Sequence, residues 1–474
     1  MLRLHISMKP FYYILVIIFL FLVFNCKASD KLTLIDYTTV VLKKGDDNKT
    51  IQDQNYLAKL DVTLAESAFD FQYYPIASFY ESTSGSNQGI GLEVRKKTQY
   101  GSQITLGSTY DKFESDSYSS ESPKTYLRLE QGLFRQWGYD INALPLQVAE
   151  IGQHKQALQS QLQTQNLIAR ACYLYIDTVV AFKQHALSKL TVKRSQLNLE
   201  VAESRHSLGL VAKTDVYRAK LSFISAKSRE RDDSKNVKNL LRSLSDLAGG
   251  AIYFQQENIA DSINQIFYSL PRDYIAVAMG NRGDIRALAL DSKLAHLSLF
   301  RAKKQLLPDI KLTAEINKYY DGFESDNGSF KDDLNWNVGL TYRTGFNLDK
   351  EKNNYQKQRI AYNTLIRQQQ STKRRVKDEI MNLADTIRLI QEKQLLNEER
   401  LTQATSSVEL AKLRYERGLS NNLDLMDAED ELQQVQVELI RQQANLTKNM
   451  INFAQAMGIL SIEWLNNVYK PRPT

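Results

Sequence analysis

The segment Tyr415-Glu-Arg-Gly-Leu-Ser-Asn-Asn-Leu-Asp-Leu-Met-Asp-Ala428 interrupts a long stretch of helix-forming sequence. Gly418 is the only glycine from residue 346 to 457, and this window holds no proline. Glycine and proline both disrupt a helix interior, so their absence predicts helix on either side of Gly418. We therefore expect a long helix over residues 347–416, a turn at Gly418 and a further helix over 422–458.

The first half of the chain holds a second window of the same kind. Gly209 is the only glycine from residue 153 to 248, and proline is again absent. This window predicts a long helix over residues 143–207, a turn at Gly209 and a helix over 213–248. With a rise of about 1.5 Å per residue, each of the two long helices would extend for about 100 Å. Compact globular domains rarely hold helices of that length.

The helices carry the seven-residue apolar repeat of coiled coils. In the last helix it places apolar residues at Leu425, Leu432, Leu439, Leu446, Phe453 and Leu460. A strict repeat of seven makes packed helices wind around each other with a left-handed supercoil.

Before the long helix of the second half, the apolar period changes from seven to two. Over residues 309–345 apolar and polar residues alternate in two runs, separated by the acidic, Gly- and Ser-rich stretch Asp321–Asp333. A tilted strand of about nine residues can cross an outer membrane. The first half has similar material over about residues 76–132, where the apparent hairpin Gln88–Tyr110 leaves the strand number open.

Two strands from each half would give four strands per chain. Such a sheet has open edges, which cannot persist in lipid, so other copies of the chain must close it.

The two halves form an internal repeat. At an offset of 209 residues, Gly209 aligns with Gly418 and Asp215 with Asp424. Such self-similarity indicates duplication of one structural unit. We also expect a proline to end a helix just before the first strand of each half, at Pro75 and Pro308. The predicted domains are a first structural repeat with short helices at residues 29–250, a connector at 251–274, a second repeat at 275–460 and a tail at 461–474.

Residues 1–28 are predicted to be a secretory signal peptide. A basic start leads into the apolar run Phe11–Phe24, which is too short to span a bilayer, and then into Cys26-Lys27-Ala28. Lipidation of Cys26 is the alternative to cleavage after Ala28. Removal of this segment lowers the formal charge from +7 to +4, and the remaining charge is too dispersed to favour nucleic acid.

No catalytic, cofactor or metal site is predicted. The five histidines show no metal-ligand spacing, and no glycine-rich phosphate loop occurs. After cleavage only Cys172 remains, which excludes an internal disulfide and suggests a buried cysteine on a helix.

The glycine turns resemble the paired helix–turn signatures of TolC-type outer-membrane efflux and secretion channels. The first turn is Leu208-Gly-Leu-Val-Ala-Lys-Thr-Asp-Val216, and the second is the segment quoted at the start. Three further segments are similar to the family: Glu130-Gln-Gly-Leu-Phe-Arg135, Arg282-Gly-Asp-Ile-Arg286 and Leu307-Pro-Asp-Ile310. The resemblance covers nearly the whole mature chain.

The resemblance implies an α+β membrane protein with a long coiled-coil α-helical periplasmic barrel. In a homotrimer, four strands per chain would make a shared twelve-stranded transmembrane β-barrel. The implied function is a passive, non-enzymatic channel of a tripartite efflux or type I secretion system, in the outer membrane of a Gram-negative bacterium. The implied partners are outer-membrane lipid, a periplasmic adaptor (membrane fusion) protein and, through it, an inner-membrane RND or ABC transporter, with no nucleic acid. The exported substrate stays open.

A non-pore periplasmic coiled-coil scaffold or adaptor is the alternative from another class. It would explain the heptads and the signal peptide, but not alternating strand pairs at equivalent places in both halves.

The resemblance also implies a periplasmic gate at the hairpin turns. The matching residues are Thr214, Asp215, Tyr415, Asp424 and Asp427. The plain alternative is that Thr214 caps its helix and that the acids complement the helix dipole.

The residues at the very tips of the hairpins are Leu208, Gly209, Leu210, Gly418 and Leu419. They either seal the hairpins or form the surface on which an adaptor docks. Ser420 departs from the family, whose best-known members carry an arginine there that helps to hold the entrance shut. Arg414 and Arg417 are the candidate substitutes.

Overall fold

The computed structural model describes residues 31–115, 118–250, 253–260, 271–320, 332–345, 347–420 and 422–468. The predicted signal peptide with Cys26 and most of the loop Asp321–Asp333 lie outside these ranges.

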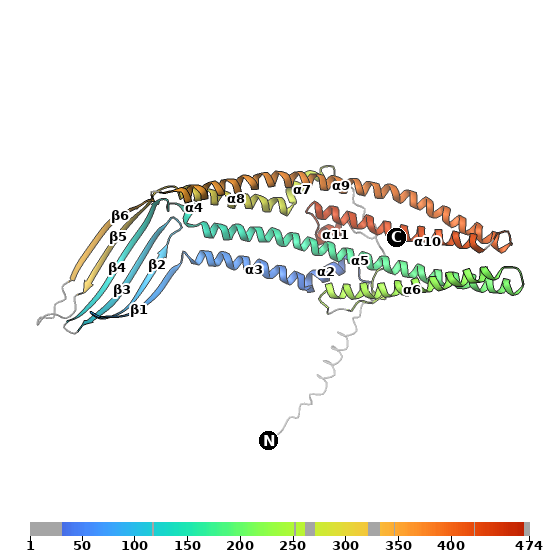
Figure 1. The fold of residues 1–474 in the computed structure, drawn as a ribbon, viewed down its shortest axis with the longest axis horizontal. Helices are drawn as coiled ribbons and strands as arrows, with labels where there is room; N and C mark the ends of the chain where they lie inside the picture. The colour runs from blue at the N-terminus through green and yellow to red at the C-terminus, as the bar shows by residue number, and fades with distance from the viewer. Residues whose placement is uncertain are drawn as a thin grey trace, which may run out of the picture. The chain divides into compact units, whose positions relative to one another are not determined.

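Two very long helices each lead into a shorter partner (Figure 1). Helix α5 (Leu144–Ser207) has 64 residues and α9 (Asp349–Glu416) has 68. Their partners α6 (Lys213–Leu247) and α10 (Asn422–Ala456) have 35 residues each. All these ends lie within two residues of the predicted ones.

The other helices are short or of moderate length. They are α2 (Leu34–Lys44), α3 (Asp46–Ser67), α4 (Tyr139–Asn142), η1 (Gln256–Asn258), α7 (Tyr274–Asn281), α8 (Gly283–Lys304) and α11 (Ile462–Val468). Across the described ranges, no helix is both long and apolar enough to cross a membrane.

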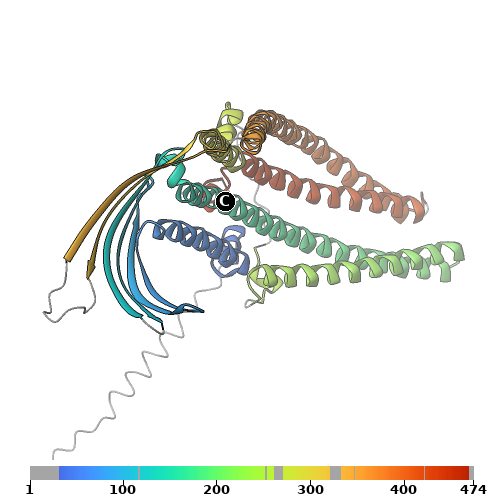
Figure 2. The ribbon, with the colours of Figure 1, turned by 60° about the vertical axis from the view of Figure 1, so that its left-hand side comes forward.

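The strands form one antiparallel sheet in the order β1-β2-β3-β4-β5-β6, and the sheet is strongly curved (Figure 2). The strands are β1 (Phe71–Ser82), β2 (Gly85–Lys97), β3 (Ser102–Ser115), β4 (Tyr118–Phe134), β5 (Asp309–Tyr320) and β6 (Asp332–Arg343). The expected four strands per chain is therefore wrong, because the first half supplies two hairpins instead of one.

The two prolines have different positions. Pro308 lies between α8 and β5, as predicted. Pro75 instead lies inside β1, because α3 has already ended at Ser67. A proline is tolerated there because β1 is at the edge of the sheet, where a strand can lack one backbone donor.

The internal repeat predicted from the sequence is also present in the secondary structure. The offset of 209 residues maps α6 onto α10 and the turn glycine Gly209 onto Gly418, and it also maps Gly249 onto Gly458. All four glycines have positive φ, between 73° and 91°. The same offset places β3 and β4 over β5 and β6, so the hairpin β1–β2 has no counterpart in the second half.

The chain divides into two compact units, each of which contains parts of both halves. The first comprises the residues up to Lys49, Thr164–Val277 and those from Glu379 onward. Its core contains Tyr37 and Tyr175, whose rings lie 6.1 Å apart. The Tyr37 hydroxyl donates to the Leu244 carbonyl at 3.1 Å, and burial raises the Tyr37 pKa well above its ordinary value.

The second unit comprises Thr50–Gln163 and Ala278–Asp378, and it contains the sheet. In its helical part α5 packs on α8 through Leu144, Ile151 and Leu297. An ion pair of 2.7 Å between Lys155 and Asp291 joins the same two helices. The helices leading to the sheet are thus held together by a small apolar core and by surface charges.

Candidate gate and channel wall

The two hairpin turns have the same backbone geometry. Gly209 and Gly418 both have φ of 73°, in the left-handed region that favours glycine. In the first turn, Leu210 N–H donates to the Arg205 carbonyl and Gly209 N–H to the His206 carbonyl, both at 2.9 Å. In the second turn, the residues 209 positions further along the chain form the same two hydrogen bonds. This pair of bonds is the Schellman motif, which ends a helix at its C-terminus.

The apolar side chains of the turns point into solvent. Leu208 and Leu210 are each 70 % exposed, and Leu419 is 72 % exposed. In the single chain these leucines therefore do not seal the hairpins. They form small apolar tips, one on each hairpin.

The predicted gate residues lie where α6 and α10 begin and where α9 ends. Thr214, Asp424 and Asp427 are exposed, and Asp215 is half-buried, 3.8 Å from Arg218. Tyr415 is buried, with 5 % of its surface exposed.

The helix-capping alternative for Thr214 is wrong. The N-cap of α6 is Ala212, which has no side-chain hydrogen bond, and Thr214 already lies inside the first turn. The acidic residues Asp215 and Asp424 do lie in first turns, where the helix dipole favours a carboxylate.

Arg205 links the two hairpins, a role that the sequence did not indicate. It lies near the end of α5, and its Nη1 and Nη2 atoms each donate to the Tyr415 carbonyl at 3.2 Å. Its guanidinium also lies 4.2 Å from the centre of the Tyr415 ring. The arginine near this turn is therefore neither Arg414 nor Arg417, both of which are exposed.

The hydroxyl group of Tyr415 does not take part in the contact with Arg205. Its hydroxyl oxygen is buried and has no hydrogen-bond partner among the described residues. Within those ranges, Tyr415 is held by its backbone carbonyl and its ring, not by its hydroxyl.

Two further contacts tie α5 to α10 of the second hairpin. Asn198 donates to Glu429 at 2.9 Å, and Lys448 pairs with Asp177 at 2.6 Å. Burial raises the pKa of Glu429 above its ordinary value. Polar side chains thus join the two hairpins of one chain at three places along their length.

The sheet has one apolar face. Along all six strands alternate residues on this face are apolar, and the thirteen named next are between 42 and 72 % exposed. They are Phe71, Tyr73, Ile90, Leu92, Ile104, Leu106, Leu127, Leu129, Ile316, Trp336, Val338, Leu340 and Tyr342. So large an exposed apolar surface requires a covering, which lipid would supply.

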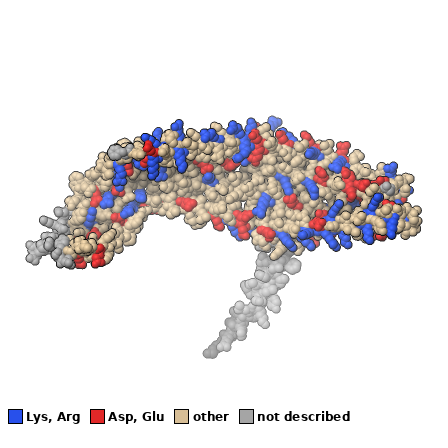
Figure 3. Space-filling model, viewed as in Figure 1, with Lys and Arg blue, Asp and Glu red and all other residues tan. Residues whose placement is uncertain are grey.

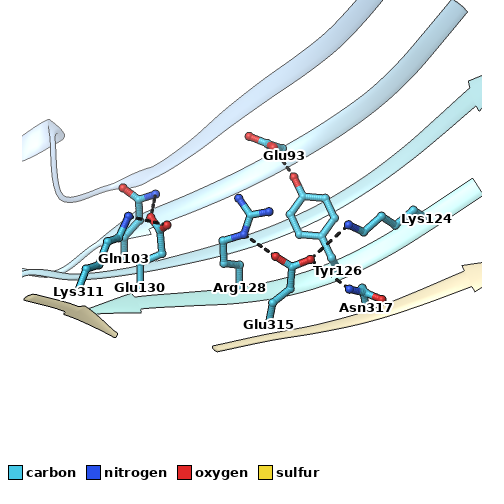
Figure 4. Close-up of polar contacts among 9 residues, drawn as sticks. All are labelled: Glu93, Gln103, Lys124, Tyr126, Arg128, Glu130, Lys311, Glu315 and Asn317. Carbon is cyan, nitrogen blue, oxygen red and sulfur yellow. Dashed lines mark hydrogen bonds and ion pairs between the residues drawn. The ribbon is translucent and has the colours of Figure 1, made fainter. Parts of the chain in front are cut away.

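The opposite face carries a network of charged side chains (Figure 4). Glu315 of β5 accepts from Arg128 at 2.7 Å and from Lys124 at 3.2 Å, both on β4. Lys311 pairs with Glu130 at 2.7 Å across the same two strands. Since each charge has an opposite partner, this face is polar without being strongly of one sign.

Tyr126 extends the network across three strands. Its hydroxyl donates to Glu93 of β2, and its ring passes over Gly107 of β3. A Cβ atom on Gly107 would come within 2.4 Å of the Tyr126 ring. Glycine at this position therefore makes room for a contact between β2 and β4.

The helices also carry charged side chains of both signs. On the face drawn in Figure 3, basic and acidic side chains are interspersed over the helical part. That face offers no broad basic surface of the kind that binds nucleic acid.

Long paired helices and an antiparallel sheet with one apolar and one charged face define an α+β outer-membrane channel. Residues 275–459 match the outer membrane efflux protein family. The chain is 23% identical to the outer membrane protein TolC of Escherichia coli over 378 residues, which cover 76% of this chain and 75% of TolC.

Solved channels have the same fold. The outer membrane protein VceC of Vibrio cholerae superposes with a TM-score of 0.66 at 17% identity, covering 90% of this chain and 96% of VceC. The open state of the MtrE outer membrane channel of Neisseria gonorrhoeae gives a TM-score of 0.67 at 15% identity, covering 90% and 89%.

The matched segment, the similarity to TolC and the shared fold all agree with the TolC-type resemblance of this chain. The chain is an efflux channel of the outer membrane with a periplasmic helical part, and it is not an enzyme. These predictions from the sequence are confirmed, and the non-pore scaffold is set aside.

Proposed function

We propose that three copies of this chain form one continuous passive conduit, each copy contributing its sheet to a shared barrel. The observation that carries this proposal is the division of the sheet into an apolar face and a charged face. The apolar face would contact lipid, and the charged face would line an aqueous lumen. The edges of a single sheet cannot remain unpaired in lipid, so closure by further copies follows.

The periplasmic end of the conduit would be gated by the hairpin turns. A threefold axis repeats Asp424 and Asp427 three times each, and both are exposed at the start of α10. A ring of carboxylates favours cations and repels anions. Thr214 and Asp215 lie at the equivalent place on the first hairpin and would line the same opening.

Arg205 would keep the gate in its closed arrangement. The family arginine is replaced by Ser420, but Arg205 supplies a guanidinium to the backbone and ring of Tyr415. Opening of the gate by separation of the hairpins would have to break this contact.

The exposed leucines at the tips would dock a periplasmic adaptor protein. Leu208 with Gly209 and Leu210 forms one apolar tip, and Gly418 with Leu419 forms the other. The adaptor would in turn connect the conduit to an inner-membrane transporter of the RND or ABC class.

Planar-bilayer recording tests the conduit and its gate. The purified wild-type protein should form small cation-preferring pores. The double variant Asp424→Asn with Asp427→Asn should conduct more and lose much of that preference, because the ring loses its charge.

The matched control is Glu398→Gln with Glu399→Gln, which removes two exposed carboxylates from α9 away from the turns. It should conduct like wild type. Folded, membrane-inserted protein that forms no pore would refute the conduit, and equal conductance of the two double variants would refute the aspartate gate.

A further inference from the structure

We infer that the barrel closes with all six strands of each chain, so that the trimer has eighteen strands and not twelve. The inference rests on the trimeric conduit proposed above. It concerns the hairpin β1–β2, which has no counterpart in the second half of the chain.

The hairpin β1–β2 is fully paired to the rest of the sheet. Its two strands are matched over twelve residue pairs, from Phe71 with Lys96 to Ser82 with Gly85. Strand β2 is matched to β3 over twelve further pairs, from Ser86 with Glu114 onward. A flap folded away from the sheet would not form this second ladder.

The hairpin also keeps the same apolar and polar faces as the other strands. Tyr73 lies opposite Val94, and Val94 lies opposite Leu106 on the apolar face. Tyr73 is 67 % exposed and Ile90 is 65 % exposed, as much as the apolar residues of β6. A one-residue shift in register would move these side chains to the charged face. Their position on the apolar face indicates that the hairpin contacts lipid like the other strands.

The charged face fastens the hairpin from the other side. The hydrogen bond from Tyr126 to Glu93 joins β4 to β2 across Gly107. The Arg95 guanidinium of β2 lies 4.6 Å from the centre of the Tyr74 ring of β1. Side-chain contacts thus extend over this face from β5 to β1, which is what a continuous lumen wall requires.

A second copy of the chain is the occupant that fits the two free edges. In the described sheet β1 and β6 each pair on one side only. Strand β1 starts where α3 ends, whereas β6 ends where α9 begins, so β1 of one copy would run antiparallel to β6 of the next. Because each chain supplies an even number of strands, the joint between copies has the same antiparallel pattern as every other pair. Pro75 has no backbone N–H, so in the closed barrel, where β1 is no longer an edge, one position of this twelve-residue strand would lack a ladder hydrogen bond.

The additional strands would widen the barrel. Its diameter grows roughly in proportion to strand number, so eighteen strands give about a 1.5-fold larger diameter than twelve. Barrels of about that size leave an open aqueous channel. The long helices of the two halves contain no insertion that corresponds to the hairpin β1–β2. The narrowest part of the conduit would therefore lie outside the barrel.

Cysteine cross-linking between copies tests the closure. Ser78→Cys on the charged face of β1 is combined in turn with Asn335→Cys, Asn337→Cys, Gly339→Cys and Thr341→Cys on the same face of β6. The native Cys172 is fully buried and its pKa is raised to about 12, so it does not interfere. Mild oxidation of the membrane-embedded protein should give covalent dimers and trimers at one or two adjacent registers, because only directly opposed residues have Cβ atoms about 5 Å apart.

Two controls make the outcome decisive. Ser78→Cys with Thr313→Cys should give no links, because β5 is one strand further from the free edge. Thr109→Cys on β3 with the same β6 cysteines should also give none. If wild-type protein forms pores while β3, and not β1, links to β6, the barrel closes with four strands per chain and the inference is overturned. Pore-forming protein without any link from β1 to β6 overturns it equally, whereas absence of pores refutes the conduit itself.

Discussion

Replacing Arg205 with alanine removes the contact that joins the two hairpins near their turns. In the wild-type chain its two terminal nitrogens donate to the Tyr415 carbonyl, each at 3.2 Å, and its guanidinium lies over the ring at 4.2 Å. The variant keeps both helices, because alanine is a good helix former. The change therefore acts on how the hairpins are held together rather than on either helix.

The size of the effect follows from these contacts. Both hydrogen bonds share one acceptor oxygen, so together they count as about one charge-assisted bond of roughly 1.5 kcal/mol. The cation–π contact of a partly exposed arginine adds about 0.5 kcal/mol. A loss of about 2 kcal/mol changes the ratio of closed to open hairpins by about 30-fold.

Single-channel recording measures this ratio as open probability. Arg205→Ala should open about ten- to thirty-fold more often, and Arg205→Lys should give a similar loss because lysine lacks the planar fork. The control is Tyr415→Phe, which keeps the ring and the carbonyl. It should behave like wild type, because the hydroxyl has no partner among the described residues. If Tyr415→Phe opens the channel and Arg205→Ala does not, the hydroxyl holds the gate and our reasoning is wrong.

Three further predictions concern single residues in the helical part. Burial raises the Glu429 pKa above its unfolded value, so this carboxyl favours folding most at acid pH, and that contribution is lost as pH rises through the folded pKa. Glu429→Gln should thus raise the melting temperature at neutral pH and have little effect at acid pH; an equal gain at both would contradict this account. Cys172 is fully buried with a pKa of about 12, so maleimide should label it only after denaturation, and rapid labelling of the native protein would show that this core opens. Gly418→Ala should lower stability by about 1 kcal/mol, because alanine is strained at positive φ, and Gly418→Asn should cost less. Among the described residues other than its chain neighbours, no atom lies within 4 Å of a Cβ at Gly418, so a much larger loss measured by thermal unfolding would contradict a purely conformational cost.

The sequence predicted those features that depend on local rules. The ends of α5, α6, α9 and α10 follow from where glycine and proline interrupt helix-forming sequence, and the structure places them within two residues. The positive φ of both turn glycines follows from the same rule. The strands β5 and β6 follow from strict alternation of apolar and polar residues.

The contact of Arg205 with Tyr415 could not be predicted, because the two residues are 210 positions apart. Local patterns do not indicate which helices of different hairpins become neighbours. The family resemblance therefore indicates gate residues near the turns, but it does not indicate Arg205, which joins the hairpins.

The strand number was wrong for a different reason. A proline after helix-forming sequence predicts a helix end at Pro75, but an edge strand tolerates proline, and β1 continues through it. A useful signal was nevertheless present. At the offset of 209 residues, β3 and β4 match β5 and β6, so the strand-forming material directly before Ser102 had to be an addition to the repeat.

An inserted hairpin is the smallest addition that enlarges such a sheet without disturbing the helices. Two strands return the chain to the end of the sheet from which it started. The turn between β2 and β3 indeed lies beside the end of β4, where the Gly138 N–H donates to the Tyr100 carbonyl at 3.3 Å. One added strand would instead leave the chain at the opposite end and reverse every later strand. The inserted hairpin precedes both turn hairpins, α5–α6 and α9–α10, in the chain, so it adds two strands to the sheet without adding a residue to either turn hairpin.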